Sequence, residues 1–314
     1  MQYVGFDIGG TKCAVSVGEK SENGIKILGR KEIKTDKTVS AYVMIDRMCD
    51  SLRELTSKAD VIGISCGGPL DSKKGLILSP PNLPGWDRVE IVKYLEEKLK
   101  VKAFLENDAN ACAVAEWKLG AGRGYENMIF LTFGTGLGAG LILNGKLYRG
   151  ASDTAGEVGH IRLADFGPVG YGKTGSFEGF CSGNGIAQIA AIKAMEKFQI
   201  GQDVSYCEDI TTINQITAKS VAEFASKGLD DAIEVYKICG TMLGKGLSVL
   251  IDILNPEIIV LGSVFQRTEK LLRDAMEKSI GEECLLQSSS VCKIVPAELK
   301  DNIGDYAALS VANL

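Results

Sequence analysis

The sequence has little of what several large classes of protein require. It contains a single histidine, and its nine cysteines are scattered without a C-x-x-C pair, so a four-ligand zinc site is hard to build and a reduced compartment is expected. No apolar run is long enough to cross a membrane or resembles a signal segment. No block of Lys or Arg occurs and the net charge is −5, so neither nucleic acid nor an anionic membrane is expected as a partner. We therefore expect a cytoplasmic protein.

A chain of 314 residues exceeds the usual size of a single core, which predicts two domains with a cleft between them. Apolar spacing and turn residues predict a mixed α/β chain. The expected strands span residues 3–8, 13–17, 61–65, 101–105, 128–133, 141–143, 146–148 and 258–261. The expected helices span residues 38–58, 88–99, 109–119, 185–198, 217–226, 230–253, 267–279 and a last one from about 304. Residues 150–184 are rich in glycine and lack periodicity, which predicts a long functional loop region.

The motif DIGGTK, residues 7–12, lies at the tip of the first predicted hairpin. Its glycines let the backbone approach phosphate oxygens, and Thr11 and Lys12 add donors. Asp7 stands where a metal ion or a metal-bound water would bridge phosphates. A tight turn with an exposed aspartate explains these six residues equally well, so the motif alone leaves both readings open.

A second glycine loop, FGTGLGAG, spans residues 133–140. It satisfies the dinucleotide fingerprint G-x-G-x-x-A, and Asp153 follows about 20 residues on. That fingerprint requires a helix directly after the glycines, whereas here a predicted strand and the turn Asn144-Gly145 follow. We therefore expect a phosphate cradle between two strands and not a Rossmann site.

A third stretch, GPVGYGKT at residues 167–174, matches the P-loop pattern G-x-x-x-x-G-K-[ST]. A P-loop joins a strand to a helix whose N-terminus receives the phosphate. After Thr174 come Gly175, Ser176 and Gly179, which is poor helix sequence. The context therefore argues against a P-loop.

Five motifs in this order and spacing (DIGGTK, PNLPGW, END, GTGLGAG and GEVGH) resemble the ROK sugar-kinase family over residues 3 to about 310. The resemblance implies an actin-like fold of the ASKHA, ribonuclease H-like type, with ATP and sugar in an interdomain cleft. It implies a smaller N-terminal domain of residues 1–108 with about 300–314, and a larger domain of residues 109–299. It also implies a homodimer and a small-molecule sugar as substrate.

The resemblance assigns roles where residues match. The family's catalytic aspartate corresponds to Asp108, which would accept the proton of a sugar hydroxyl during transfer from Mg-ATP. An aspartate before an apolar helical run is also a good N-cap, and the two roles are compatible. The implied sugar-binding residues are Gly68 with its neighbour Gly67, Asn82, Asn107, Glu157, His160 and Glu178. The implied residues for the nucleotide are Asp7, Gly9, Gly10, Thr11, Lys12, Thr132, Gly134, Thr135, Gly136 and Gly262.

The chain departs from the family after GEVGH. Most members carry a C-x-C-G-x-x-G-C-x-E segment whose cysteines and histidine hold a structural zinc ion. Here Val169, Tyr171 and Ser176 replace the three cysteines, and these side chains are poor or impossible zinc ligands. No structural zinc and no protein-bound metal is therefore expected, and either the packing of Val169, Tyr171 and Phe177 or a bound sugar has to order this segment.

Several functions remain to be weighed. The favoured one is a glucokinase-like phosphorylation, at O6 of an aldohexose, with ATP and Mg²⁺. An N-acetylhexosamine kinase, a fructokinase, another phosphoryl donor and a non-catalytic sugar sensor or regulator stay open as alternatives. Family repressors carry a DNA-binding domain before the first glycine motif, for which the six residues before Asp7 leave no room. An acetate kinase or a chaperone ATPase would not need PNLPGW, END and GEVGH, and a catalytically dead relative would be expected to lose Asp108.

Overall fold

The computed structural model describes residues 1–22 and 24–314, which fold into two compact units. The first unit comprises Met1–Phe130, Gly140–Gly156 and Glu298–Leu314, and the second comprises Leu131–Ala139 and Glu157–Ala297. The C-terminal residues therefore return to the unit that contains the N-terminus. Helix α3 (Asp108–Leu119) belongs to the first unit because its alanines pack against helix α10 (Ile303–Val311).

The first unit is built on a five-stranded sheet of order β3-β2-β1-β4-β7. Its strands are β1 (Gln2–Ile8), β2 (Lys12–Ser21), β3 (Gly24–Lys34), β4 (Val61–Cys66) and β7 (Ala103–Asn107). Strands β4 and β7 run parallel to β1, while β2 and β3 are antiparallel neighbours. All six residues of β4 are buried, which explains its continuous apolar sequence.

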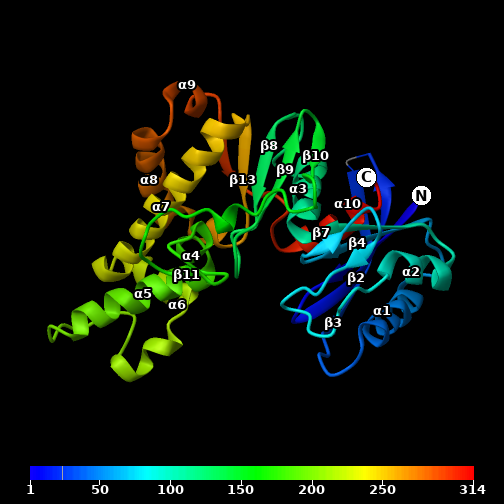
Figure 1. Cartoon of the computed structure of the whole chain (residues 1–314), viewed down its shortest axis with the longest axis horizontal. Coiled ribbons are helices and arrows are strands. Elements are labelled where there is room, and N and C mark those ends of the chain that lie inside the picture. The colour runs from blue at the N-terminus through cyan, green and yellow to red at the C-terminus, as the bar shows by residue number, and fades with distance from the viewer. Residues whose placement is uncertain (23) are drawn as a thin grey trace. The chain divides into compact units, whose positions relative to one another are not determined.

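Helices cover both faces of this sheet (Figure 1). On one face, α1 (Ala41–Leu55) and α2 (Ile91–Leu99) bury apolar side chains against Phe6 and Ile64. On the other face, α10 packs Leu309 against Tyr3. Because side chains alternate along β1, the strand contributes to two separate core layers, one on each face of the sheet. A short two-stranded ribbon of β5 (Leu70–Asp71) and β6 (Leu76–Ile77) lies outside the main sheet.

The second five-stranded sheet has the order β10-β9-β8-β13-β14. Its strands are β8 (Met128–Leu131), β9 (Ala139–Leu143), β10 (Lys146–Tyr148), β13 (Ile258–Leu261) and β14 (Lys293–Pro296). Asn144 and Gly145 join β9 to β10 with φ values of 52° and 68°, the type I′ geometry that the Asn-Gly pair predicts. Strand β9 follows the glycine loop directly, as predicted, so the loop lacks the helix of a Rossmann site.

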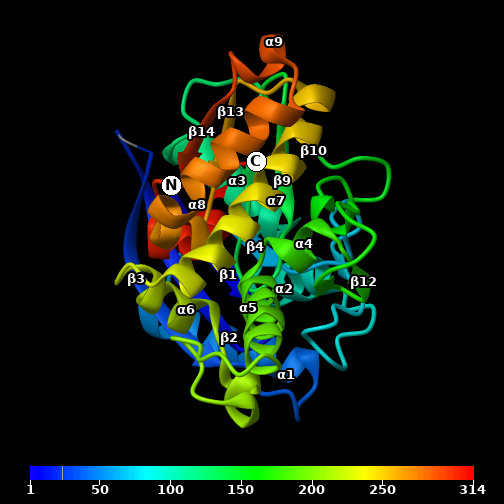
Figure 2. The ribbon, with the colours of Figure 1, turned by 90° about the vertical axis from the view of Figure 1, so that its left-hand side faces the viewer.

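Strands β13 and β14 belong to the second unit, which also contains the helices α4 (Phe177–Phe180), α5 (Gly183–Phe198), α6 (Ala218–Ala225), α7 (Asp230–Leu254), α8 (Val264–Glu283) and α9 (Leu286–Ser289). Figure 2 shows α7 running beside α8, where Gly240 and Gly244 admit the backbone of Leu272 and Met276. Within the ranges that the structure describes, no helix is both long and apolar enough to cross a membrane.

The glycine-rich region predicted as a long loop contains short elements. These are a 3₁₀ turn at Val158–His160 and a hairpin of β11 (Val169–Gly170) and β12 (Lys173–Thr174), followed by α4. The P-loop-like stretch at residues 167–174 forms this hairpin, which differs from the strand-to-helix turn that a P-loop requires.

Candidate active site

The first unit presents Asp108 at the junction of β7 and α3. Asn107, and not Asp108, is the N-cap of α3: its Oδ1 accepts hydrogen bonds from the backbone N–H of Ala109 at 2.9 Å and of Asn110 at 3.3 Å. The idea that Asp108 could be the cap is therefore wrong, although its Oδ1 also accepts from Ala109 N at 2.8 Å. The Asp108 side chain stays accessible to solvent. A carboxylate so placed can meet a substrate.

Asp7 and Asp108 share an acidic environment. The surrounding protein desolvates the Asp108 carboxylate and raises its pKa, even though solvent reaches the side chain. Desolvation and the charges of Asp108 and Asp305 raise the pKa of Asp7 to about 6, against a hydrogen bond from Ser65 that lowers it. Ionising both groups without a cation is therefore unfavourable.

This environment fits Mg²⁺, which binds hard oxygen ligands and usually keeps several waters. Among the described residues no group of three or more His, Cys, Asp or Glu side chains is placed to enclose a metal ion. Asp7 would therefore serve as a single anchor, with phosphate oxygens and water as the other ligands.

The predicted sugar-binding residues of the first unit surround Asp108. A Cβ atom placed on Gly67 would lie 3.8 Å from Asp108 Oδ2, and one on Gly68 would lie 3.4 Å from Asn107 Nδ2. Since capping uses Asn107 Oδ1, the amide Nδ2 is the group left to donate to a ligand. Asn82 is exposed, and its backbone O lies 2.6 Å from where a Cβ on Gly10 would sit. The predicted sugar-binding residue Asn82 therefore adjoins the first glycine turn.

Glu106, to which the sequence analysis assigns no role, holds this junction together. It is fully buried and accepts hydrogen bonds from the backbone N of Asn107 and from Asn110 Nδ2, both at 3.0 Å. Its other oxygen accepts from Arg149 Nε at 2.7 Å. An acidic residue at the end of an apolar strand, beside the predicted base, was the available signal.

The first glycine turn is closed by its own backbone. Gly9 N donates to Lys12 O at 3.1 Å, and Thr35 Oγ1 donates to Gly9 O at 2.6 Å. Thr11 is exposed, as predicted for a phosphate ligand. Lys12 is also exposed, but its Nζ forms an ion pair with Glu32 at 2.9 Å, so binding a phosphate requires it to leave or share that partner.

The second glycine loop, in the second unit, is braced at two points. Gly138 N donates to Thr132 Oγ1 at 3.0 Å, so Thr132 closes the base of the loop instead of pointing to a ligand. Leu137 N donates to Glu178 Oε2 at 2.9 Å. Thr135 is exposed at the tip, between Gly134 and Gly136. Glu178, predicted as a sugar ligand, therefore contacts the second glycine loop.

The GEVGH segment packs against the same loop. A Cβ on Gly159 would lie 2.2 Å from Leu137 O, so only glycine permits this approach. Glu157 and His160 flank the buried Val158 and are both exposed. Glu178 approaches the same glycine, since its Cβ lies 3.1 Å from where a Cβ on Gly159 would sit.

The segment without zinc ligands is ordered mainly by hydrogen bonds. Phe177 is fully buried, as predicted, but Val169 is 45% exposed and Tyr171 74% exposed, so packing of these two does not order it. Instead, Gln188 of α5 brackets Val169, accepting from its N–H and donating to its C=O, both at 2.9 Å. Gly175 N donates to Pro168 O at 2.9 Å.

The turn after β13 lies beside the second glycine loop. Gly262 N donates to Leu131 O at 2.9 Å, and Val264 N donates to Phe133 O at 2.8 Å. Ser263 has a φ of 49°, a conformation that glycine adopts readily and serine does not. Its N–H donates to Gln266 Oε1 at 3.1 Å.

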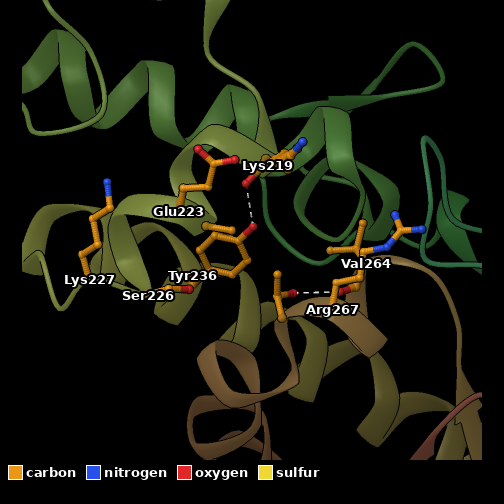
Figure 3. Close-up of a pocket in the computed structure, with 10 residues that line it drawn as sticks. Lys219, Glu223, Ser226, Lys227, Tyr236, Val264 and Arg267 are labelled. Atoms are coloured by element: carbon orange, nitrogen blue, oxygen red, sulfur yellow. Dashed lines mark hydrogen bonds between the residues drawn. The ribbon is translucent and has the colours of Figure 1, made fainter.

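A cavity of about 820 Å³ opens directly after this turn (Figure 3). Tyr236 of α7 lines it, with its hydroxyl donating to Ala218 O of α6 at 2.8 Å, and Val264 and Arg267 line it from α8. The other lining residues are Lys219, Ala222, Glu223, Ser226, Lys227 and Thr268. Only Gly262, which precedes the lining residue Val264, was predicted from the sequence in this region, since no motif marks a cavity shared by three helices.

Comparison with known proteins agrees with this arrangement. The ROK family model matches residues 3–313. A glucokinase of Halalkalibacterium halodurans is 34% identical over 269 residues, which cover 83% of this chain and 79% of that protein. The xylose repressor of Bacillus subtilis is 27% identical over 245 residues, which cover 77% of this chain and 58% of the repressor.

A solved structure extends the likeness to the fold. The ROK family glucokinase from Streptomyces griseus, in complex with glucose and AMPPNP, has a TM-score of 0.79 at 27% identity, covering 100% of this chain and 99% of that one. Together with the two α/β units described above, this match confirms the predicted actin-like fold. This chain therefore belongs to the ROK family.

Proposed function

We propose that this sugar phosphotransferase of the ROK family transfers the γ-phosphoryl group of ATP to a hexose hydroxyl, with O6 of an aldohexose as the favoured acceptor. The observation that carries the proposal is the state of Asp108. Asn107 takes the capping role, so the Asp108 carboxylate remains accessible, and desolvation raises its pKa above the ordinary value. Such a carboxylate can accept the hydroxyl proton as the O–P bond forms.

On the acceptor side, the first unit offers the Asn107 amide, Asn82 and the backbone at Gly68. The second unit offers Glu157, His160 and Glu178 for the remaining hydroxyls. Glu178 Oε2 already accepts from Leu137 N, which leaves Oε1 for a sugar. Because the same carboxylate braces the phosphate loop, sugar and nucleotide would be positioned together.

On the donor side, the backbone N–H groups at Gly134, Thr135 and Gly136 would cradle phosphates, as would the turn at Gly9 and Gly10. The cavity after Gly262 would take the nucleoside, since it begins beside the same loop and is lined by aromatic, aliphatic and polar groups. Mg²⁺ bound near Asp7 would neutralise charge on the transferred phosphoryl group.

A sugar-responsive regulator is the second candidate, because a xylose repressor is among the relatives. A regulator needs a sugar site but neither a base nor a metal anchor. The presence of Asp7 and Asp108 with raised pKa values therefore favours the kinase.

The test is an ADP-release assay with Mg-ATP over glucose, mannose, allose, fructose, N-acetylglucosamine and N-acetylmannosamine. We expect sugar-dependent turnover, highest on an unmodified aldohexose. Turnover only on an N-acetylhexosamine or on fructose would keep the kinase and replace the substrate. A thermal shift with sugar but no turnover, with ATP or polyphosphate as donor, would favour the regulator.

A further inference from the structure

His160 is held by the β11–β12 hairpin through two contacts. Lys173 Nζ donates a hydrogen bond to the backbone O of His160 at 2.6 Å. The Tyr171 ring meets the His160 imidazole edge to face, with centroids 6.3 Å apart and planes at 72°. One contact restrains the backbone of His160 and the other restrains its ring.

Tyr171 occupies a backbone position that suits it badly. It forms the two-residue turn of the hairpin with Gly172, and their φ values are 44° and 74°. A type I′ turn of this kind favours Asn, Asp or Gly at the first position, as at Asn144 in the β9–β10 hairpin. A bulky aromatic residue there is strained, and such strain is a pointer to function.

Core packing does not explain the tyrosine. Its side chain is 74% exposed, and its hydroxyl forms no hydrogen bond with any residue that the structure describes. The ring contact with His160 is what the side chain provides at this position.

The hairpin itself is fixed firmly enough to act as a support. Gln188 anchors Val169 through two hydrogen bonds of 2.9 Å. Gly170 lies against the N-terminus of α4, where a Cβ would come within 2.5 Å of Gly179 N. Because the hairpin is held in place, its contacts also hold His160 in place.

We propose that Tyr171 and Lys173 are positioning residues that orient His160 for contact with the sugar hydroxyls. This inference rests on the proposed function for its sugar, but the ordering of His160 can be measured without any turnover. The ring of Tyr171 sets the imidazole plane, while the Lys173 ammonium fixes the carbonyl at the end of the 3₁₀ turn.

The test exploits the fact that His160 is the only histidine in the chain. Its imidazole gives one set of C–H signals in an NMR spectrum of the whole protein, without assignment. We compare wild type with Tyr171→Phe, Tyr171→Asn and Lys173→Met, and use Tyr148→Asn, an exposed tyrosine on the β9–β10 hairpin, as the matched control. The same proteins are assayed for KM and kcat on the sugar found active.

Tyr171→Asn is the decisive variant, because asparagine suits the turn better than tyrosine and the hairpin should persist. We expect its melting temperature to equal or exceed that of wild type, while the His160 signals move and the sugar KM rises roughly three- to tenfold at nearly constant kcat. Tyr171→Phe should leave the His160 signals and the sugar KM unchanged, and Lys173→Met should broaden or shift the His160 signals.

His160 signals that stay at the wild-type position in Tyr171→Asn and Lys173→Met would overturn the inference, whatever the kinetics. The same holds for unchanged sugar KM in both variants of an active enzyme. A wild type that phosphorylates no sugar would contradict the proposed function, yet the NMR comparison would still decide whether the hairpin orders His160.

Discussion

In the first unit the candidate site is built from carboxylates at strand ends, whereas in the second it is built from backbone amides on a glycine loop. Asp7 lies near the end of β1 and Asp108 directly follows β7, two parallel strands separated by β4, and the charge of Asp108 raises the pKa of Asp7. In the second unit Gly134–Gly136 present N–H groups, and the nearby Glu178 is occupied by Leu137 N. In the proposed function the first unit would therefore supply proton and metal chemistry, and the second would supply the geometry for a phosphate chain.

The largest expected effect comes from removing the base in the first unit. Asp108→Asn keeps the size of the side chain but cannot accept a proton, so kcat should fall roughly 10²- to 10⁴-fold while sugar KM changes little. Steady-state kinetics measures both. Asp50→Asn, an exposed carboxylate paired with Arg53, is the control and should behave as wild type. Full activity of Asp108→Asn would show that Asp108 in the first unit is not the catalytic base.

Asp7→Asn should raise the melting temperature at high pH while it lowers activity. The pKa of Asp7 is raised from 3.8 to about 6, so the folded state holds its proton more tightly than the unfolded chain. Stability from this group is full below pH 3.8 and is lost as the pH rises through about 6. The variant should therefore melt higher than wild type at pH 8 but not at pH 3.5, and its Mg²⁺-dependent kcat should fall roughly 10²-fold. A lower melting temperature at pH 8 would contradict the assigned environment.

The loss of activity at low pH should also arise from the carboxylates of the first unit. As the pH falls through about 6, Asp7 takes up a proton, so kcat/KM should drop about tenfold per pH unit. The raised pKa of Asp108 acts in the same direction. Binding of AMPPNP by the second unit relies on amides and should vary less over the same range. Calorimetry of AMPPNP binding at pH 5 and pH 7.5 measures this difference. Equal losses of binding affinity and of turnover would contradict the prediction.

Gly136→Ala should disturb the second unit alone. The new Cβ would lie 2.6 Å from Glu178 Oε2, so the carboxylate must move and its bond with Leu137 N weakens. We expect KM for ATP to rise roughly tenfold with the pH profile unchanged. Gly281→Ala, at a site with open space for a methyl group, is the control. A change in the acid limb of the pH profile would show that a substitution in the second unit affects the ionisable groups of the first.

The smallest effect is expected at the turn after β13. Ser263→Gly relieves a residue held at φ 49° and should raise the free energy of unfolding by about 1 kcal/mol, with KM for ATP within twofold. Denaturant melts measure it, and Ser263→Ala, which keeps the strain, should show no such gain. A destabilised glycine variant would mean that the serine side chain outweighs its backbone strain.

Local sequence predicted the elements that carry most of the site. Buried runs such as β4 and β13 are readable from their apolar residues, and the Asn144-Gly145 turn from its residue pair. Strand β3 was not predicted, because its side chains are only half-buried or exposed and polar residues separate its few apolar ones. Strand β14 is only four residues long and half-buried.

The parts of the site that sequence could not predict depend on contacts between distant residues. Whether Asn107 or Asp108 caps α3 depends on side-chain geometry that both residues allow. The bond between Glu178 and Leu137 spans 41 residues, and the cavity beside Tyr236 is assembled from three helices. The hairpin is held by Gln188, which lies outside every motif.

The most direct measurement is a ³¹P NMR time course of the wild-type protein with Mg-ATP and glucose. The proposed kinase activity predicts one sugar 6-phosphate signal growing in step with ADP, and a reaction slowed by Asp108→Asn. Release of inorganic phosphate without a sugar phosphate, or a phosphorylated sugar formed equally fast by the variant, would contradict it.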